Sequence, residues 1–189
     1  MTDRKVLTEE EWIALRRAEA AARPLPPPPP MHKMASVEAF RQMTYIISHA
    51  TYSMAVSDPK GVELFLPPDL PDAELGARAH EALRASRFIA PDHPEWDAVM
   101  RAPFTEETVR AGDRRLMEAA GVRTLKALRT GARFVTLTLR DGVISIAPWQ
   151  QHRGGGWTGL DPSLTLTVPE GTPDEALGQA VREALGRSR

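Results

Sequence analysis

The chain contains two copies of one short sequence segment, here called the repeated phrase, which align without insertion or deletion. Residues 71–87 read PDAELGARAHEALRASR, and residues 173–189 read PDEALGQAVREALGRSR. The two phrases begin at Pro71 and Pro173, 102 positions apart. Self-similarity at a fixed distance is the signature of a duplicated structural unit. A chain of 189 residues is therefore expected to fold as two copies of one small unit, which restricts it to an architecture with two similar halves.

Each phrase is predicted to form a helix with one apolar face. A proline at the entrance costs nothing, because the first N–H groups of a helix lack partners, and the aspartate that follows meets the positive end of the helix dipole. Apolar residues then recur at i, i+4, i+7 and i+8, which places them on one face. In the first copy they are Leu75, Ala79, Ala82 and Leu83, and in the second Leu177, Val181, Ala184 and Leu185.

A glycine occurs at the same place in both predicted helices, as Gly76 and Gly178. Glycine inside a helix costs about 1 kcal/mol relative to alanine. Its presence at matched positions predicts that each helix backbone lies close to the sheet that the helix covers. This interpretation favours a packing role over contact with a ligand.

Segments rich in β-branched residues precede each helix. In the first half, the turn Asp58–Gly61 separates two of them. In the second half, an Asp-Gly turn at residues 141–142 joins two strands, and a third segment alternates with period two. The predicted fold class is therefore α+β, with two antiparallel β-meander-plus-helix repeats in a pseudo-twofold relation. Both halves are predicted to have the order strand, strand, strand, helix. The first half has a β-like segment at residues 44–56 and a strand at 62–66, and the second half has strands at 133–139, 143–148 and 163–168.

The N-terminal region is predicted to be a short helix on a stiff spacer. Thr8 and Glu11 have the spacing of a capping box, and a helix from Glu9 to about Arg23 follows. The run PLPPPPP, residues 24–30, is expected to adopt polyproline II, because its prolines lack backbone donors. Such a run can be a ligand for an aromatic groove, but a spacer is the simpler interpretation.

The limits of the regions follow from these patterns. Between the repeats, Pro94 is predicted to start a short helix, and Thr105 to cap a longer one that ends at Gly121. The predicted regions are an N-terminal helix with a proline-rich linker (residues 1–35) and an α+β domain (residues 36–189), which consists of repeat 1 (about 43–90), a helical connector (91–130) and repeat 2 (about 131–189).

Composition argues against several kinds of chemistry. A net charge of −1 and a pI of about 6.5 lack the basic excess of most nucleic-acid-binding domains. The absence of cysteine removes thiol catalysis and thiolate metal sites and suits a reducing cytosol. The five histidines lack metal-site spacing, and no catalytic constellation is evident, so we expect no cofactor, no metal and no enzymatic activity. No run suits a membrane span or a signal peptide, so we expect a cytoplasmic protein.

The loop QQHRGGGWTGLD, residues 150–161, is the segment most suited to recognition. Its glycines suggest phosphate binding, but the loop leads to a strand rather than a helix, so a connection between strands is the simpler interpretation. Arginine and tryptophan are over-represented at binding hot spots. The candidate partner-binding residues are therefore His152, Arg153 and Trp157, although Trp157 equally suits a place in the core.

Several short motifs recur in a fixed order between residues 43 and 189. Each copy has a strand, an acidic turn, a Leu-Gly pair and A-L-x-x-S-R, and a G-x-I-x-I-x-P strand at Gly142–Pro148 precedes the loop with glycine and tryptophan. This order resembles the contact-dependent growth inhibition (CDI) immunity proteins of bacteria. The resemblance implies a cytoplasmic protein that binds the toxic C-terminal domain of a cognate effector, often a nuclease, and blocks it without catalytic residues or a cofactor. Specificity would then come from charge and shape complementarity.

Two other functions remain open at this point. Twinned antiparallel sheets can present a platform for single-stranded nucleic acid, for which Arg153, Trp157, Tyr45 and Tyr52 are the only hints. A small enzyme with a cleft between the repeats would need converging polar groups that the sequence does not reveal. A protein partner is the expected association, without membrane or nucleic acid, and the oligomeric state stays open.

Overall fold

The computed structural model describes residues 8–13, 27–102, 105–152 and 156–189. The chain divides into two compact units, Met1–Pro30 and Met31–Arg189. The predicted boundary after residue 35 lies within the second unit, because a strand already begins at Lys33.

In the first unit, residues 9–13 are helical. The Thr8 N–H donates to Glu11 Oε2 at 2.9 Å, and the Glu11 N–H donates to Thr8 Oγ1 at 3.3 Å. These reciprocal bonds satisfy backbone donors that have no partner within the helix, so the predicted capping box is confirmed. The remainder of the predicted helix, up to Arg23, and the first prolines of the run lie outside the described residues.

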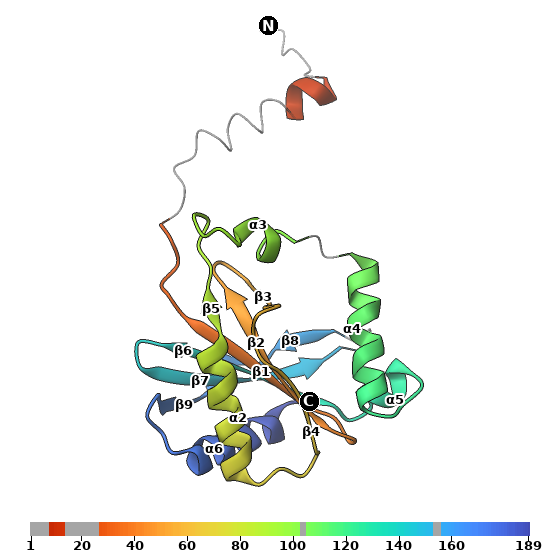
Figure 1. Cartoon of the computed structure of the whole chain (residues 1–189), viewed down its shortest axis with the longest axis vertical. Coiled ribbons are helices and arrows are strands. Elements are labelled where there is room, and N and C mark those ends of the chain that lie inside the picture. Colours follow the sequence, from red (N-terminus) through yellow and green to blue (C-terminus); the bar gives the residue numbers. More distant parts are fainter. Residues whose placement is uncertain (1–7, 14–26, 103–104, 153–155) are drawn as a thin grey trace, which may run out of the picture. The chain divides into compact units, whose positions relative to one another are not determined.

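In the second unit, the described residues contain one sheet of nine strands (Figure 1). The main path runs β3-β2-β1-β6-β7-β8, while β4 and β5 also pair with β2 and β9 pairs with β7. The pairing is antiparallel except between β2 and β5. The strands are β1 (Lys33–Ala39), β2 (Thr44–Thr51), β3 (Ala55–Ser57), β4 (Glu63–Leu66), β5 (Arg87–Phe88), β6 (Arg133–Arg140), β7 (Val143–Gln151), β8 (Trp157–Gly159) and β9 (Leu166–Pro169).

The helices confirm the α+β class. Helices α2 (Asp72–Ala85) and α6 (Asp174–Arg187) are the two repeated phrases, and they lie together on one face of the sheet (Figure 1). Thr105 caps α4 by accepting the N–H of Thr108, and Gly121 follows the helix with a φ of 65°, as predicted. The connector helices are α3 (Trp96–Val99), α4 (Glu106–Ala119) and α5 (Leu125–Arg129).

The β-like segment of the first half, residues 44–56, forms two strands, β2 and β3, with a bend between them, and β4 follows, so three strands precede α2 after β1. One predicted strand of the second half differs from the structure. Residues 163–168 begin within a 3-10 turn, Pro162–Leu164, and β9 starts only at Leu166. The carboxylate of Asp161 accepts the N–H of Ser163 at 2.9 Å, which gives this backbone a local partner in place of a neighbouring strand.

Strand β1 was not predicted, yet it lies at the centre of the sheet. Its sequence, KMASVEA, has only weak β character. It pairs with β2 on one side and β6 on the other, so Ser36 lies opposite both Ile47 and Thr136. Strand neighbours on both sides, rather than intrinsic propensity, account for this strand. The same pairing joins the two halves into one continuous sheet.

The main core lies between the sheet and helices α2 and α6. All eight residues of the two predicted apolar helix faces are buried there, so this prediction is confirmed. Alternate strand residues meet them from the sheet. A fully buried Leu, Ile or Val contributes roughly 1.5–3 kcal/mol. The largest contributors from the strands, each 0% exposed, are Val37, Ile46, Val135, Leu137, Ile144 and Ile146.

The matched glycines mark a contact between the two helices, and the prediction that they lie against the sheet is wrong. A Cβ atom on Gly76 would lie 1.7 Å from the carbonyl oxygen of Asp174, and one on Gly178 would lie 1.8 Å from that of Asp72. The backbone of the first turn of each helix therefore packs directly against the glycine of the other helix. Only a residue without a side chain permits such an approach.

Each repeated phrase also ends in a serine that fastens its helix to the sheet. Ser86 Oγ donates to the carbonyl of His49 at 2.7 Å and accepts the N–H of Met34 at 2.8 Å. Ser188 makes the corresponding bonds to β7 and β6 at 2.6 and 3.0 Å. Both serines are buried, so each satisfies two backbone groups of its own half.

Candidate binding surface

The face of the sheet away from α2 and α6 carries polar and aromatic side chains, because successive strand residues point to opposite faces. Ser36 Oγ and His49 Nε2 are 2.9 Å apart, and Trp149 Nε1 donates to Thr136 Oγ1 at 3.0 Å. Ser36 and Thr136 are buried, and burial lowers the pKa of His49. These two side-chain contacts join β1 to β2 and β7 to β6 within the sheet.

One row of side chains crosses five strands on this face. Phe65, Tyr45, Glu38 and Phe134 are successive partners on β4, β2, β1 and β6. The ring centroids of Tyr45 and Phe65 are 5.2 Å apart, and those of Phe134 and Trp149, on β7, are 5.7 Å apart. We call these five residues the aromatic row. Its outer end is open to solvent, since Phe65 is 41% exposed.

The predicted recognition loop folds back as a hairpin beside this row. Strand β8 pairs with β7, so Trp157 lies opposite Gln151. The partly buried ring of Trp157 stacks on Phe134, with the centroids 5.2 Å apart and an angle of 28° between the planes. Trp157 therefore combines the two roles considered from the sequence: it packs against a small core cluster and keeps part of its surface exposed.

The other two candidate residues have different positions. His152 is exposed, its backbone N–H donates to the Gly156 carbonyl at 2.8 Å, and its ring forms a hydrogen bond with Thr158. Both bonds hold the hairpin closed. Arg153 lies outside the described residues. The structure therefore places His152 and Trp157 on one hairpin, with His152 on the solvent side and Trp157 against the sheet.

The carboxyl group of Glu38 lies under this hairpin and was missed by sequence reasoning. Burial raises its pKa from 4.5 to about 7, while the positive charge of Arg129 and a hydrogen bond from the Trp157 indole counteract part of the rise. Arg129 on α5 also pairs with Asp113 on α4 at 2.9 Å. Glu38 thus contacts the hairpin and faces the connector helices. Its position becomes recognisable only once residues 33–39 are known to be a strand.

Replacing Glu38 with glutamine should raise the free energy of unfolding above neutral pH by up to about 3 kcal/mol. The folded state holds the Glu38 proton up to a pKa of about 7, against 4.5 in the reference state. The wild-type chain should therefore gain stability as the pH falls from 8 to 5, while Glu38→Gln should show a flatter profile. Urea unfolding across this range measures the difference. Glu107→Gln, on the exposed first turn of α4, is the control; coincident profiles for the wild type and Glu38→Gln would contradict the assignment.

A second polar group supports the open end of the row. The hydroxyl of Tyr45 donates to Glu63 Oε1 at 2.8 Å, and Arg115 on α4 pairs with Glu63 Oε2 at 3.0 Å. Burial is the main cause that raises the pKa of Tyr45 well above its usual value, followed by the hydrogen bond to Glu63. The phenol therefore stays neutral and holds Glu63 in place. Connector and sheet together thus present a surface with fixed geometry.

The chemistry of this surface suits binding. Partly exposed tryptophan and tyrosine rings supply large contact areas with few rotatable bonds. In the part of the chain that the structure describes, no three His, Asp or Glu side chains gather as a metal site would require. Within the same ranges, no helix is both long and apolar enough to cross a membrane.

Known proteins show the same fold. A solved structure of a CdiA-CT/CdiI toxin and immunity complex from Yersinia pseudotuberculosis matches with a TM-score of 0.73 and 24% identity, over 84% of this chain and 98% of that chain. A protein of unknown function from Neisseria meningitidis matches with a TM-score of 0.74 and 23% identity, over 84% and 96%. At these identities the likeness shows the fold alone.

Sequence comparison gives the family. The immunity protein CdiI-YPIII of Yersinia pseudotuberculosis is 26% identical over 167 residues, which cover 82% of this chain and 94% of that protein. The profile of the CDI immunity protein family, CdiI, matches residues 33–188. That range starts with β1 and ends with the serine that closes α6. The chain therefore belongs to the CDI immunity protein family.

Proposed function

We propose that this protein is the immunity protein of a contact-dependent growth inhibition system and acts in the cytoplasm. It binds the toxic C-terminal domain of its cognate effector, a nuclease, and neutralises it by occupying its surface rather than by turnover. The observation that carries this proposal is the family match over residues 33–188, which spans nearly the whole second unit. The solved relative with this fold is described as part of a toxin and immunity complex.

We also propose that the hairpin and the aromatic row face the toxin. The supporting observation is that Trp157, Trp149 and Phe65 are only partly buried although they belong to one continuous row or stack on it. In the sequence, His152 and Arg153 follow β7 and precede β8. A cluster of aromatic anchors with polar residues around it is the arrangement that interface hot spots share.

Replacing Trp157 with alanine should weaken toxin binding by at least about tenfold, as truncation of a hot-spot aromatic does. It should also lower the melting temperature, because the ring stacks on Phe134 and packs against a core cluster. His152→Ala and Arg153→Ala should weaken binding with little change in melting temperature. Calorimetric titration and thermal unfolding separate the two effects. Wild-type affinity in all three variants would remove the hairpin from the interface.

Co-expression tests the function as a whole. The toxic C-terminal domain encoded beside this gene is produced with and without this protein, and survival and co-purification are scored. We expect rescue together with a stoichiometric complex, and no rescue by an immunity protein from an unrelated pair. Growth arrest in the presence of folded protein, with no complex, would refute the proposal. Assay of the purified toxin on RNA and DNA decides whether it is a nuclease.

We propose, further, that the family domain is built from two halves related by a pseudo-twofold axis that passes between Ser36 and Thr136. The pairing register supports this relation, because Val37 lies opposite Val135 and Ala35 opposite Leu137. If each residue is replaced by the one 100 positions away in the other strand, Val37 becomes Leu137 and Val135 becomes Ala35, so the first pair becomes the second. The matched serine bonds and the reciprocal glycine contacts agree with it. The first half then begins with β1, ten residues earlier than residue 43.

A further inference from the structure

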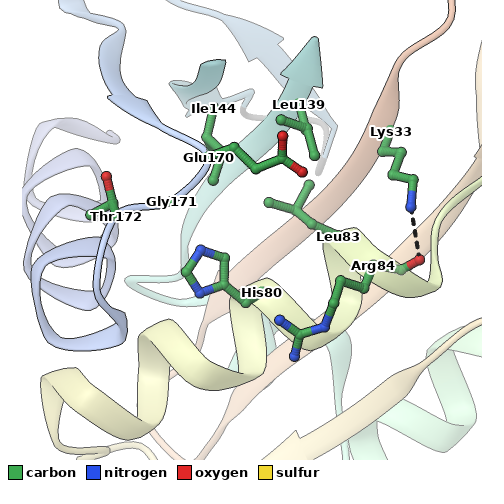
Figure 2. A pocket seen from close by; sticks show the side chains of 9 residues that line it. All are labelled: Lys33, His80, Leu83, Arg84, Leu139, Ile144, Glu170, Gly171 and Thr172. Carbon is green, nitrogen blue, oxygen red and sulfur yellow. Dashed lines mark hydrogen bonds between the residues drawn. The ribbon is translucent and has the colours of Figure 1, made fainter. Parts of the chain in front are cut away.

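A pocket of about 230 Å³ opens where α2 passes the loop between β9 and α6. Figure 2 shows the side chain of Glu170 extending over Leu139 and Leu83, with His80 on α2 and Thr172 on the loop nearby. A second hollow of about 300 Å³ adjoins it and shares three of its residues. The pocket is lined by Lys33, His80, Leu83, Arg84, Leu139, Ile144, Glu170, Gly171 and Thr172.

His80 lacks half of its hydrogen bonds in this pocket. Its Nδ1 lies 2.7 Å from Asp174 Oδ1. A carboxylate only accepts, so Nδ1 carries a proton, and in the neutral form of the ring Nε2 is an acceptor. The side chain is 13% exposed, and Nε2 is fully buried without a partner among the described residues. A buried polar atom without a partner is costly, so it indicates a place where a donor is missing.

The other half of the molecule shows which donor fits such a place. The residue equivalent to His80 is Arg182, whose Nε donates to Asp72 Oδ1 at 2.6 Å and whose Nη2 donates to the Leu70 carbonyl at 2.5 Å. Leu70 is 5% exposed and belongs to the core. Position 172 corresponds to position 70 and holds the smaller threonine. The site around His80 and Thr172 therefore has a shorter side chain at both positions than the site around Arg182 and Leu70, and a pocket lies where the latter site has a guanidinium.

We propose that this pocket binds the guanidinium group of an arginine side chain from a partner protein. Two groups at this pocket can accept its N–H donors: the carboxylate of Glu170, and the neutral form of His80, whose buried Nε2 has no partner among the described residues. The alkyl part of an arginine packs on the apolar side chains of Leu83, Leu139 and Ile144. Planar guanidinium groups are well suited to such multi-acceptor sites.

The positive charges at the pocket fix the position of the guanidinium. Lys33 Nζ donates to the carbonyl of Arg84 at 3.1 Å, at the C-terminal end of α2 (Figure 2). The side chains of Lys33 and Arg84 are both positively charged, and they repel an incoming arginine from that end of the pocket. The guanidinium of the arginine therefore lies at the end with Glu170 and His80. Substitutions at the two ends should therefore act in opposite directions: Glu170→Gln weakens binding, and Lys33→Ala strengthens it.

A small probe tests the pocket without any toxin. N-acetyl-L-arginine methylamide is titrated into the full chain at neutral pH, and the amide signals of Gly171 and Thr172 and the ring signals of His80 are followed by NMR. A single charged group in a preformed site should bind in the millimolar range. The citrulline analogue, which has the same shape without the charge, is the control. Saturable shifts with the arginine probe alone support the proposal; no shifts, or equal shifts with both probes, overturn it.

A variant supplies the missing group from within the chain. His80→Arg should make the bonds that Arg182 makes in the other half, raise the melting temperature and abolish the shifts caused by the probe. His80→Leu removes the unpaired nitrogen without supplying a guanidinium and should also lose the probe. Retention of probe binding by both variants would show that the arginine probe binds outside this pocket.

A measurement of toxin affinity tests whether the partner's arginine enters the pocket, and it rests on the proposed function: His80→Arg should then reduce toxin affinity. Failure of the wild-type chain to bind toxin would refute that function, whereas the probe titration would still decide the pocket.

Discussion

Replacing Gly76 with alanine should lower the free energy of unfolding by about 3 kcal/mol or more, although alanine is the better helix former. The new methyl carbon would lie 1.7 Å from the carbonyl oxygen of Asp174. The obstacle is helix backbone and not a flexible side chain, so α2 and α6 must separate. Separation would loosen the buried layer that both helices share with the sheet. Chemical denaturation of Gly76→Ala and Gly178→Ala measures the loss.

Gly112 provides the matched control, because it also lies inside a helix, but a methyl group added there would meet no described atom within 4 Å. Gly112→Ala should stabilise the chain by about 0.5–1 kcal/mol through helix propensity. Opposite signs at positions 76 and 112 would establish close helix contact as the cause. A gain of stability in Gly76→Ala would show that the two helices do not meet as described.

Replacing Asp58 with alanine should cost about 3 kcal/mol, the usual effect of breaking a buried ion pair from one side. The Asp58 side chain is 0% exposed and receives two N–H donors of Arg87 at 2.6 Å each. It also accepts the N–H of Lys60 at 3.0 Å, which shapes the turn before β4. The substitution leaves these donors unpaired, and only Glu95 still neutralises Arg87.

The exposed pair between Arg101 and Asp97 is the control, since its side chains are 70% and 82% exposed. Asp97→Ala should leave the midpoint of urea unfolding unchanged, because solvent screens such pairs. Asp58→Asn should recover part of the loss by keeping the turn hydrogen bond. Equal midpoints for the wild type and Asp58→Ala would show that the network does not contribute to stability.

Local patterns predicted the parts of the fold that local forces determine. The capping box at Thr8 and the N-cap at Thr105 depend on residues three positions apart, so the sequence reveals them directly. The apolar faces of α2 and α6 follow from helical periodicity in the same way. Strand β1 depends instead on partners that lie up to about a hundred residues away, and its own sequence contains little evidence for it.

The candidate surface was predicted only in part, for the same reason. Trp157 was recognised by residue type, but its stacking on Phe134 arises from strand pairing. The matched glycines were interpreted correctly as positions of close approach and wrongly as contacts with the sheet. Periodicity shows that a helix backbone is approached, and only the tertiary structure shows by what.

The pairing of β1 with β6 has a consequence for how the chain is made. On the ribosome, β1 emerges near residue 39 and its partner only after residue 133. At about 5–20 residues per second, the first half waits roughly 5–20 s with one side of its central strand unpaired. An open strand of this kind is a template for pairing with other nascent chains. We therefore expect slow translation of the connector, residues 91–130, to increase aggregation. We also expect a chaperone that shields β1 to increase the yield of folded protein.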